Sequence, residues 1–300
     1  MSNTVAPTND VLFEVLTRVI SEGRCIVVVG AGVSAADYPL WPDLIAILQE
    51  RCGLRAEDLR TANPLDIAQA AKDKNPEQYA QALDDVFRRK ERVLSSKRYH
   101  LLARISFASY LNLNFDPLLL DILDLHFDVT VSEYPHLQNQ HHGPRELFYM
   151  HGRLGPGRPA ATSPIVLTRS EFERAYDPLQ TRLHGFIQAT MLDHHVCFLG
   201  CNPTEPYLAR LLAACKSFCD ADHGLIDPKR PRWFLLAEDS YLDSPSLTAS
   251  GIHVVRYPRR DASFSGMDAV LDYWSKKQPP AFRTPGVEPS PYRVDVEPER

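Results

Sequence analysis

The stretch Cys25-Ile-Val-Val-Val-Gly-Ala-Gly-Val-Ser34 decides the fold of this chain. Residues 26–29 form a β-branched run that predicts a buried strand, and glycines follow it directly. Val11–Ile20 before the stretch and Trp41–Leu48 after it both carry apolar residues at helical spacing. The glycines therefore lie in a turn between a strand and a helix.

The rest of the chain repeats this alternation of strands and helices. Short apolar runs typical of strands lie at Tyr110–Leu113, Val129–Val131, Leu147–Met150, Val196–Gly200, Trp233–Leu236 and His253–Val255. Helical spacing begins near Glu171 and again covers Tyr207–Phe218. We therefore expect an α/β fold, with a Rossmann-like parallel sheet that has helices on both faces.

Two segments interrupt or follow this pattern. Residues 54–100, approximately, are rich in alanine, glutamine and charged residues and hold no strand-like run, which predicts an inserted helical lobe. The whole catalytic domain is expected to span residues 10–275. Residues 277–300 carry many prolines and charges with little apolar periodicity, so we expect a C-terminal arm or linker there.

Composition narrows the possible functions. The formal net charge is −5 and the hydrophobic content is 44 %, so the chain can bury a core and has no basic field for direct nucleic acid binding. We expect a cytoplasmic protein without membrane contact, because the N-terminus resembles no leader and no apolar stretch reaches about 20 residues. The six cysteines are scattered without C-x-x-C spacing, and no metal site is expected.

The glycine turn is the first candidate binding site. Gly30, Ala31 and Gly32 let the backbone approach a pyrophosphate, helix-start amides can face its charge, and the hydroxyl of Ser34 adds a donor. The third glycine of G-x-G-x-x-G is missing, however. An ordinary strand-to-helix turn could use the same residues.

Several short motifs taken together are similar to those of a known family. GAGVS at 30–34, LNFD at 113–116, MHG at 150–152 and FLGCN at 198–202 resemble the ordered motifs of the sirtuin family. WPDL at 41–44 and TRSEF at 168–172 resemble its bacterial branch associated with antiphage defence. The resemblance spans roughly residues 10–260.

The same resemblance implies an activity. Sirtuin deacylases carry a Cys-rich zinc ribbon and a longer stretch after the glycine turn, and this chain has neither. It is more similar to the defence members, which are NAD hydrolases. The resemblance implies NAD as the substrate, no metal cofactor and a role in antiviral defence.

The resemblance also singles out site residues. Asn114 and His151 each follow a predicted strand and are expected to be catalytic, Asn114 by orienting ribose or water and His151 by accepting a proton. Asp116 is expected to be part helix cap and part ribose orienter. The cofactor-binding set is expected to comprise Gly30, Ala31, Gly32, Ser34, Trp41, Gly200 and Asn202.

Each of these residues has an alternative role. Asn114–Pro117 could be only a turn that caps a helix beginning at Pro117, and His151 could merely bond a carbonyl. Gly200–Asn202 could be a strand-end turn, with Asn202 playing no part in binding.

The preferred function is therefore an NAD glycohydrolase that releases nicotinamide and ADP-ribose. A non-catalytic NAD or ADP-ribose sensor that acts through oligomerisation is one alternative, and an NAD-dependent deacylase or ADP-ribosyltransferase is another. The family analogy also implies a homo-oligomer with a possible ATPase, argonaute-like or sensor partner.

Overall fold

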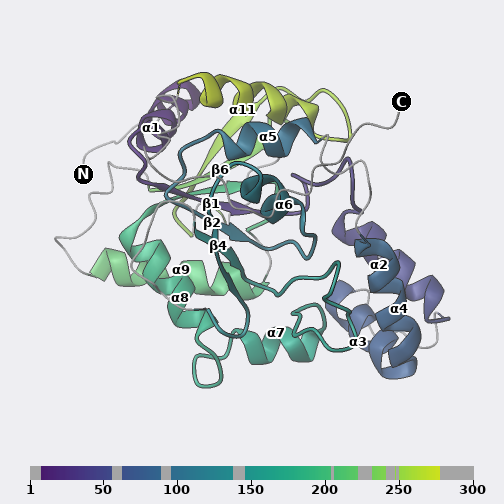
Figure 1. The fold of residues 1–300 in the computed structure, drawn as a ribbon. Coiled ribbons are helices and arrows are strands. Elements are labelled where there is room, and N and C mark those ends of the chain that lie inside the picture. Colours follow the sequence, from purple (N-terminus) through teal and green to yellow (C-terminus); the bar gives the residue numbers. More distant parts are fainter. Residues whose placement is uncertain are drawn as a thin grey trace, which may run out of the picture.

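A parallel sheet forms the centre of the molecule. The computed structural model describes residues 8–55, 63–88, 96–137, 146–203, 206–221, 232–240, 247 and 250–277 (Figure 1). Within these residues seven strands, all parallel, run in the order β3-β4-β2-β1-β5-β6-β7. The strands are β1 (Cys25–Val29), β2 (Ser109–Asn112), β3 (Thr130–Glu133), β4 (Glu146–Tyr149), β5 (His195–Leu199), β6 (Trp233–Glu238) and β7 (Ile252–Tyr257). The expected α/β fold with a Rossmann-like sheet is confirmed.

The order of the strands creates a switch point beside β1. From β1 the chain builds the β2, β4 and β3 side of the sheet, and it then returns to place β5 on the other side of β1. Val29, at the end of β1, pairs with both Asn112 and Leu199, so the three strands end level. Ligands of open parallel sheets bind at the carboxyl ends of strands near such a point.

Helices cover both faces of the sheet, as Figure 1 shows. Val27 and Val29 belong to one apolar core, and the alternate residues Ile26 and Val28 belong to the other. The first core is covered by α1 (Asn9–Ser21), α5 (Lys97–Ala103), α6 (Leu118–Asp124) and α11 (Ser265–Lys277). The second core is covered by α7 (Arg169–Ala175), α8 (Leu183–Asp193) and α9 (Pro206–Ala221).

A group of three helices lies beside the sheet and forms the helical lobe. These are α2 (Trp41–Arg51), α3 (Pro64–Lys74) and α4 (Pro76–Phe87), which contact one another. Asn63 and Asn75 cap α3 and α4 by accepting hydrogen bonds from the amides of Leu65 and Gln78. Within the expected range 54–100, α5 contacts mainly α6 and α11, so it belongs to the sheet's cover.

Some elements differ from the sequence expectation. Strand β2 ends at Asn112, and β3 begins at Thr130 and is only partly buried because it lies at the sheet edge. Helix α8 was not predicted, because its apolar residues surround the helix without forming one stripe. Residues 278–300 of the expected arm lie outside the described residues, and none of the described helices is long and apolar enough to cross a bilayer.

Candidate active site

Four neighbouring strands carry the predicted site residues to one edge of the sheet. The glycine turn follows β1, Asn114 follows β2, His151 follows β4 and Gly200 follows β5. These strands are adjacent in the order β4-β2-β1-β5 and all point the same way. The structure therefore places these predicted residues at the carboxyl edge beside the switch point.

The glycines of the first turn allow two loops to pack together. The amide of Gly30 donates to the carbonyl of Leu199 at 3.0 Å, and the amide of Gly32 donates to the carbonyl of Gly200 at 2.7 Å. A Cβ atom on Gly30 would lie 2.3 Å from the Cβ of Cys201. Gly200 has φ +64°, and a Cβ there would lie 2.5 Å from the amide nitrogen of Val33. Larger residues would push the loops apart.

The backbone amides of the glycine turn do not point to an open phosphate site as expected, because several of them donate to backbone carbonyls. Val33 donates to the carbonyl of Gly30 at 3.0 Å and Ser34 donates to the carbonyl of Ala31 at 3.1 Å, in addition to the two bonds to the β5 loop. The next helix, α2, begins only at Trp41, so its first amides do not belong to this turn. The expectation of helix-start amides at the turn is therefore wrong. A pyrophosphate here would need a rearranged turn or side-chain donors.

A buried arginine that the sequence analysis missed holds the glycine turn. Arg98, from α5, donates through Nη1 to the carbonyls of Gly32 (3.0 Å) and Val33 (3.2 Å). Its Nη2 donates to the carbonyl of Ser263 at 2.8 Å, and its Nε forms an ion pair with Asp268 of α11 at 2.5 Å. The guanidinium therefore ties the turn to two distant segments.

Polar side chains are buried directly behind the turn. Ser34, Asn114 and Asp116 are 2 %, 7 % and 1 % exposed, and the Nδ2 of Asn114 lies 3.5 Å from the Oγ of Ser34. The Asn114 amide donates to the Oδ1 of Asn112 at 3.1 Å, which fixes the chain after β2. Asn114 is thus held at a buried position, with its side chain directed toward the glycine turn.

Asp116 serves as a local cap in this cluster. Its Oδ1 accepts a hydrogen bond from the amide of Leu118, the first residue of α6, at 3.1 Å. Burial raises the pKa of Asp116 to about 7, and the bond from Leu118 opposes this shift. Helix α6 begins at Leu118 and not at Pro117 as expected, and Pro117 is its N-cap residue, so Asp116 bonds the first helical amide from one position further back. The carboxyl group is partly neutral near pH 7.

The imidazole ring of His151 is neutral and is buried beside the aromatic side chains of Phe172 and Tyr176. Its side chain is 8 % exposed, and burial lowers the pKa of His151 to about 4, against a hydrogen bond to the Leu113 backbone that raises it. Its Nε2 lies 3.0 Å from the hydroxyl of Tyr176, and its ring meets Phe172 edge-on at 5.1 Å. Near neutral pH the ring is uncharged, so one of its nitrogens carries a lone pair that can accept a hydrogen bond.

Two predicted binding residues lie at the margin of this arrangement. Trp41 is half-buried and packs against both apolar cores, a structural role that needs no ligand. Asn202 is exposed beyond the β5 loop, two residues after Gly200. The buried group is therefore formed by Ser34, Asn114 and Asp116, with His151 at the neighbouring strand end.

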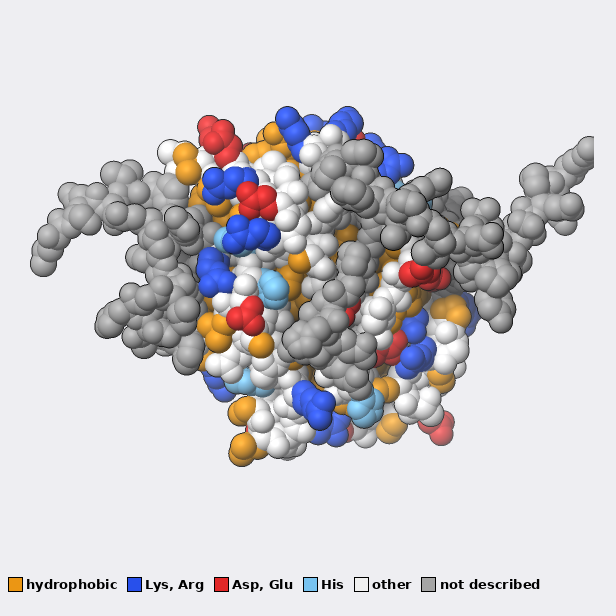
Figure 2. Space-filling model, turned by 60° about the vertical axis from the view of Figure 1, so that its left-hand side comes forward, with side chains coloured by type: hydrophobic (Ala, Val, Ile, Leu, Met, Phe, Trp, Pro, Cys, Tyr) orange, Lys and Arg blue, Asp and Glu red, His pale blue; other side chains and the backbone are white. Residues whose placement is uncertain are grey.

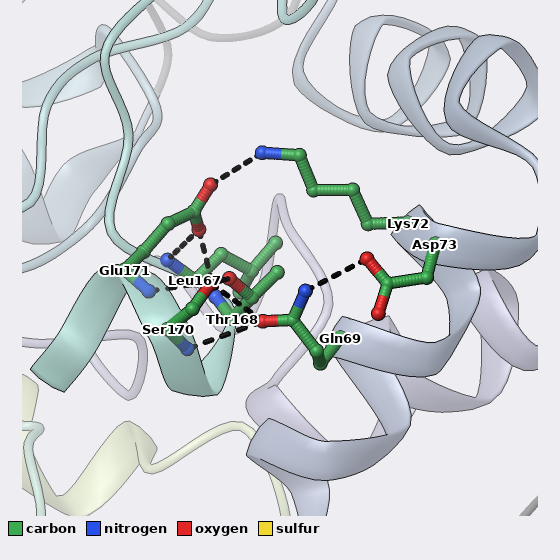
Figure 3. A network of polar contacts seen from close by, with 7 residues as sticks. All are labelled: Gln69, Lys72, Asp73, Leu167, Thr168, Ser170 and Glu171. Atoms are coloured by element: carbon green, nitrogen blue, oxygen red, sulfur yellow. Dashed lines mark hydrogen bonds and ion pairs between the residues drawn. The ribbon is translucent and has the colours of Figure 1, made fainter.

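The TRSEF motif forms a clamp between the lobe and the sheet (Figure 3). Glu171 of α7 binds Lys72 of α3 at 2.6 Å and accepts hydrogen bonds from the amides of Leu167 (2.9 Å) and Thr168 (2.8 Å). The side chain of Gln69, also on α3, accepts hydrogen bonds from the amide and hydroxyl of Ser170. We call these contacts the α3–α7 clamp.

The described residues contain no group of three or more histidine, cysteine or acidic side chains that could hold a metal ion. Four of the five described cysteines, Cys25, Cys52, Cys197 and Cys215, are buried, and all five are free thiols. On the face in Figure 2, both cationic and acidic side chains are visible among the described residues.

Open parallel sheets bind ligands at the carboxyl ends of strands near a switch point, which is where this chain places its polar side chains. Residues 108–254 match the family model of the SIR2-like domain. The chain is also 24 % identical over 244 residues to the NAD(+) hydrolase ThsA of Enterococcus faecium. The matched region is 78 % of this chain and 48 % of that relative, so the chain spans about half of the relative's length.

Proposed function

We propose that this chain is an NAD glycohydrolase that cleaves the bond between nicotinamide and ribose. The observation that carries the proposal is that buried Asn114 and neutral His151 follow the adjacent strands β2 and β4 at the same edge of the sheet as the glycine turn. The similarity to a protein named as an NAD(+) hydrolase supports the same conclusion.

The chemistry suits these residue types. Nicotinamide leaves NAD as a neutral base, its C–N bond breaks, and the ribose passes through an oxocarbenium-like state that water attacks. The departing group needs little acid help, so the protein's tasks are to orient the ribose and to accept a proton. Asn114 would bond a ribose hydroxyl or the water, and the neutral imidazole of His151 would take up the proton.

The remaining predicted residues would bind the rest of NAD. In this proposal Gly30, Ala31, Gly32, Ser34 and Gly200 form the floor for the phosphates and ribose. Trp41 and Asn202 would contact the ligand at the margin, and Asp116 would orient the ribose as well as cap α6. No step in this proposal requires a metal ion.

The burial of the polar group supports a regulated site. Ser34, Asn114, Asp116 and His151 are all less than a tenth exposed, and in this proposal the glycine turn or α7 moves before a dinucleotide enters. Together with the defence motifs, this supports activation within an antiphage assembly that depletes NAD. A homo-oligomer with an ATPase, argonaute-like or sensor partner is the form that the family analogy favours.

The test is to incubate the purified chain with NAD and separate nicotinamide, ADP-ribose and cyclic products by chromatography. Release of nicotinamide is expected to disappear in Asn114→Ala and in His151→Ala and to remain in His194→Ala, which changes an exposed histidine. NAD binding by calorimetry without turnover in any condition would instead support a sensor. Transfer of ADP-ribose to protein or removal of acyl groups would support the transferase or deacylase.

A further inference from the structure

The contact between His151 and Tyr176 determines which nitrogen of the imidazole is available. The Nε2 of His151 lies 3.0 Å from the Tyr176 hydroxyl, and a second hydrogen bond joins the ring to the Leu113 backbone. The Leu113 backbone contact raises the pKa of His151, as a hydrogen bond donated by the ring would, and Nε2 is already engaged by the Tyr176 hydroxyl. A neutral imidazole donates through one nitrogen and accepts through the other, so a ring that donates through Nδ1 accepts at Nε2 with a single lone pair.

The ring of Tyr176 is held in place by contacts that do not involve its hydroxyl. It stacks on Phe172 with a centroid distance of 5.7 Å and an interplanar angle of 7°, and it lies 5.9 Å from the ring of Tyr207. Phe172 also meets the His151 ring. Replacing the hydroxyl of Tyr176 by hydrogen would therefore leave the aromatic packing intact.

The helical lobe fixes the element that carries Tyr176. Tyr176 directly follows α7, and α7 is joined to α3 by Glu171–Lys72 and Ser170–Gln69 of the α3–α7 clamp (Figure 3). On its other side Tyr176 lines a hollow of about 260 Å³, together with Tyr207 and residues of α8 and α9. The ring therefore has a firm attachment on one side and open space on the other.

We propose that Nε2 of His151 accepts a hydrogen bond from Tyr176 in the resting site, so that Tyr176 is a positioning residue for the free imidazole, and that a substrate hydroxyl must displace Tyr176 from Nε2. This inference rests on the proposed function, because it takes His151 as the base. A single lone pair cannot accept two hydrogen bonds of full strength, so the Tyr176 hydroxyl and a ribose hydroxyl or water compete for it. Each productive binding event includes the loss of the Tyr176 bond.

The test compares Tyr176→Phe with Tyr207→Phe. Tyr207 belongs to the same aromatic cluster, but its hydroxyl lies 3.5 Å from Glu173 on the exposed side. In Tyr176→Phe, KM for NAD is expected to fall about two- to tenfold, as the loss of one competing hydrogen bond of ordinary strength predicts, with kcat unchanged or higher. Tyr207→Phe is expected to keep the wild-type KM.

A second readout works without turnover. The histidine side chains are labelled with ¹⁵N, and the signal of His151 is assigned by its loss in His151→Ala. The Nε2 resonance is expected to move in Tyr176→Phe and to stay in place in Tyr207→Phe, while Nδ1 remains protonated in both. An unmoved resonance, or an active Tyr176→Phe with a raised KM or lowered kcat, would overturn the proposal.

The two readouts separate this inference from the proposed function. If the wild-type protein never hydrolyses NAD but the ¹⁵N resonance still moves in Tyr176→Phe, the hydrolase assignment is wrong and the contact between Tyr176 and His151 is confirmed. If hydrolysis requires His151 but Tyr176→Phe changes neither the kinetic constants nor the ¹⁵N resonance, the hydrolase assignment stands and the role of Tyr176 is rejected.

Discussion

Replacing Arg98 by methionine should unfold the protein at markedly lower denaturant and temperature. The side chain of Arg98 is 7 % exposed and bonds the carbonyls of Gly32, Val33 and Ser263 as well as the carboxylate of Asp268. Methionine has a similar length but donates no hydrogen bond. The change would leave three acceptors and one partly buried carboxylate without their common partner.

The size of the effect follows from these contacts. Removing one partner of a buried ion pair costs about 3–5 kcal/mol, and single hydrogen bonds to a charged group cost about 1.5–3 kcal/mol each. The contributions are not additive, and the side chain of Asp268 is 26 % exposed, so water recovers part of the loss. We expect a total of about 3–5 kcal/mol, or roughly 6–20 °C in Tm.

The assay is urea and thermal unfolding followed by circular dichroism. Lys276→Met is the matched control, because it breaks an ion pair with Asp272 on the same helix whose side chains are 72 % and 40 % exposed. That control should lose less than about 1 kcal/mol. Arg98→Lys should recover only part of the loss, since an ammonium group cannot bond all four acceptors in this planar arrangement. A stability of Arg98→Met within about 1 kcal/mol of the wild type would refute the reasoning.

Three further changes test other parts of the site. Gly200→Ala should cost about 2–5 kcal/mol in urea unfolding, because alanine is strained at φ +64° and its Cβ would lie 2.5 Å from the Val33 amide. The difference in Tm between Asp116→Asn and the wild type should rise as pH increases from 4 to 7. The pKa of Asp116 is raised to about 7 in the folded state, so the wild type loses stability over this range as the unfolded chain ionises more readily, and asparagine does not titrate. Lys72→Met should lower the free energy of unfolding by about 1–3 kcal/mol, since it leaves the buried carboxylate of Glu171 without its cation.

Each of these changes has its own control. Gly23 has the same φ of +64° with nothing within 4 Å of its Cβ position, so Gly23→Ala isolates the backbone strain and should cost less than Gly200→Ala. Lys74→Met removes a more exposed lysine of α3 and should cost less than Lys72→Met. Equal costs within either pair would contradict the close approach or the clamp.

The pH experiment must separate Asp116 from His151. The lowered pKa of His151, about 4, means that the folded state loses stability as pH falls from 6.5 toward 4, the opposite direction to Asp116. His151 is present in both proteins, so its effect cancels in the difference between Asp116→Asn and the wild type. A difference in Tm that stays flat from pH 4 to 7 would argue against a raised pKa of Asp116.

The sheet could be predicted from the sequence because its signals are local. The apolar runs beginning at Cys25 and Val196 are bounded by glycine, and such runs identify buried strands without knowledge of their neighbours. Asn114 and His151 were singled out by the family resemblance and by their places after predicted strands, and the structure has them two residues after β2 and β4. The order of the strands was not predicted, because the pairing of β1 with β5 depends on residues far apart in the chain.

The supporting residues could not be found this way. Arg98 bonds Gly32 across 66 positions, and Lys72 bonds Glu171 across 99 positions, so neither contact leaves a periodic pattern. In the sequence both side chains resemble the charges of an exposed helix surface. Tyr176 is only 25 residues from His151, but nothing at either position indicates that the phenol and the imidazole meet.

The pairing of β1 with β5 also determines when during synthesis the glycine turn can be completed. A nascent chain that has reached Asp193 already contains Ser34, Asn114 and His151, but it lacks the carbonyls of Leu199 and Gly200 that accept from the turn. Such non-local pairing forms late and slowly in folding. A chain built on this topology thus remains without a finished glycine turn on the ribosome until β5 has emerged and docked beside β1.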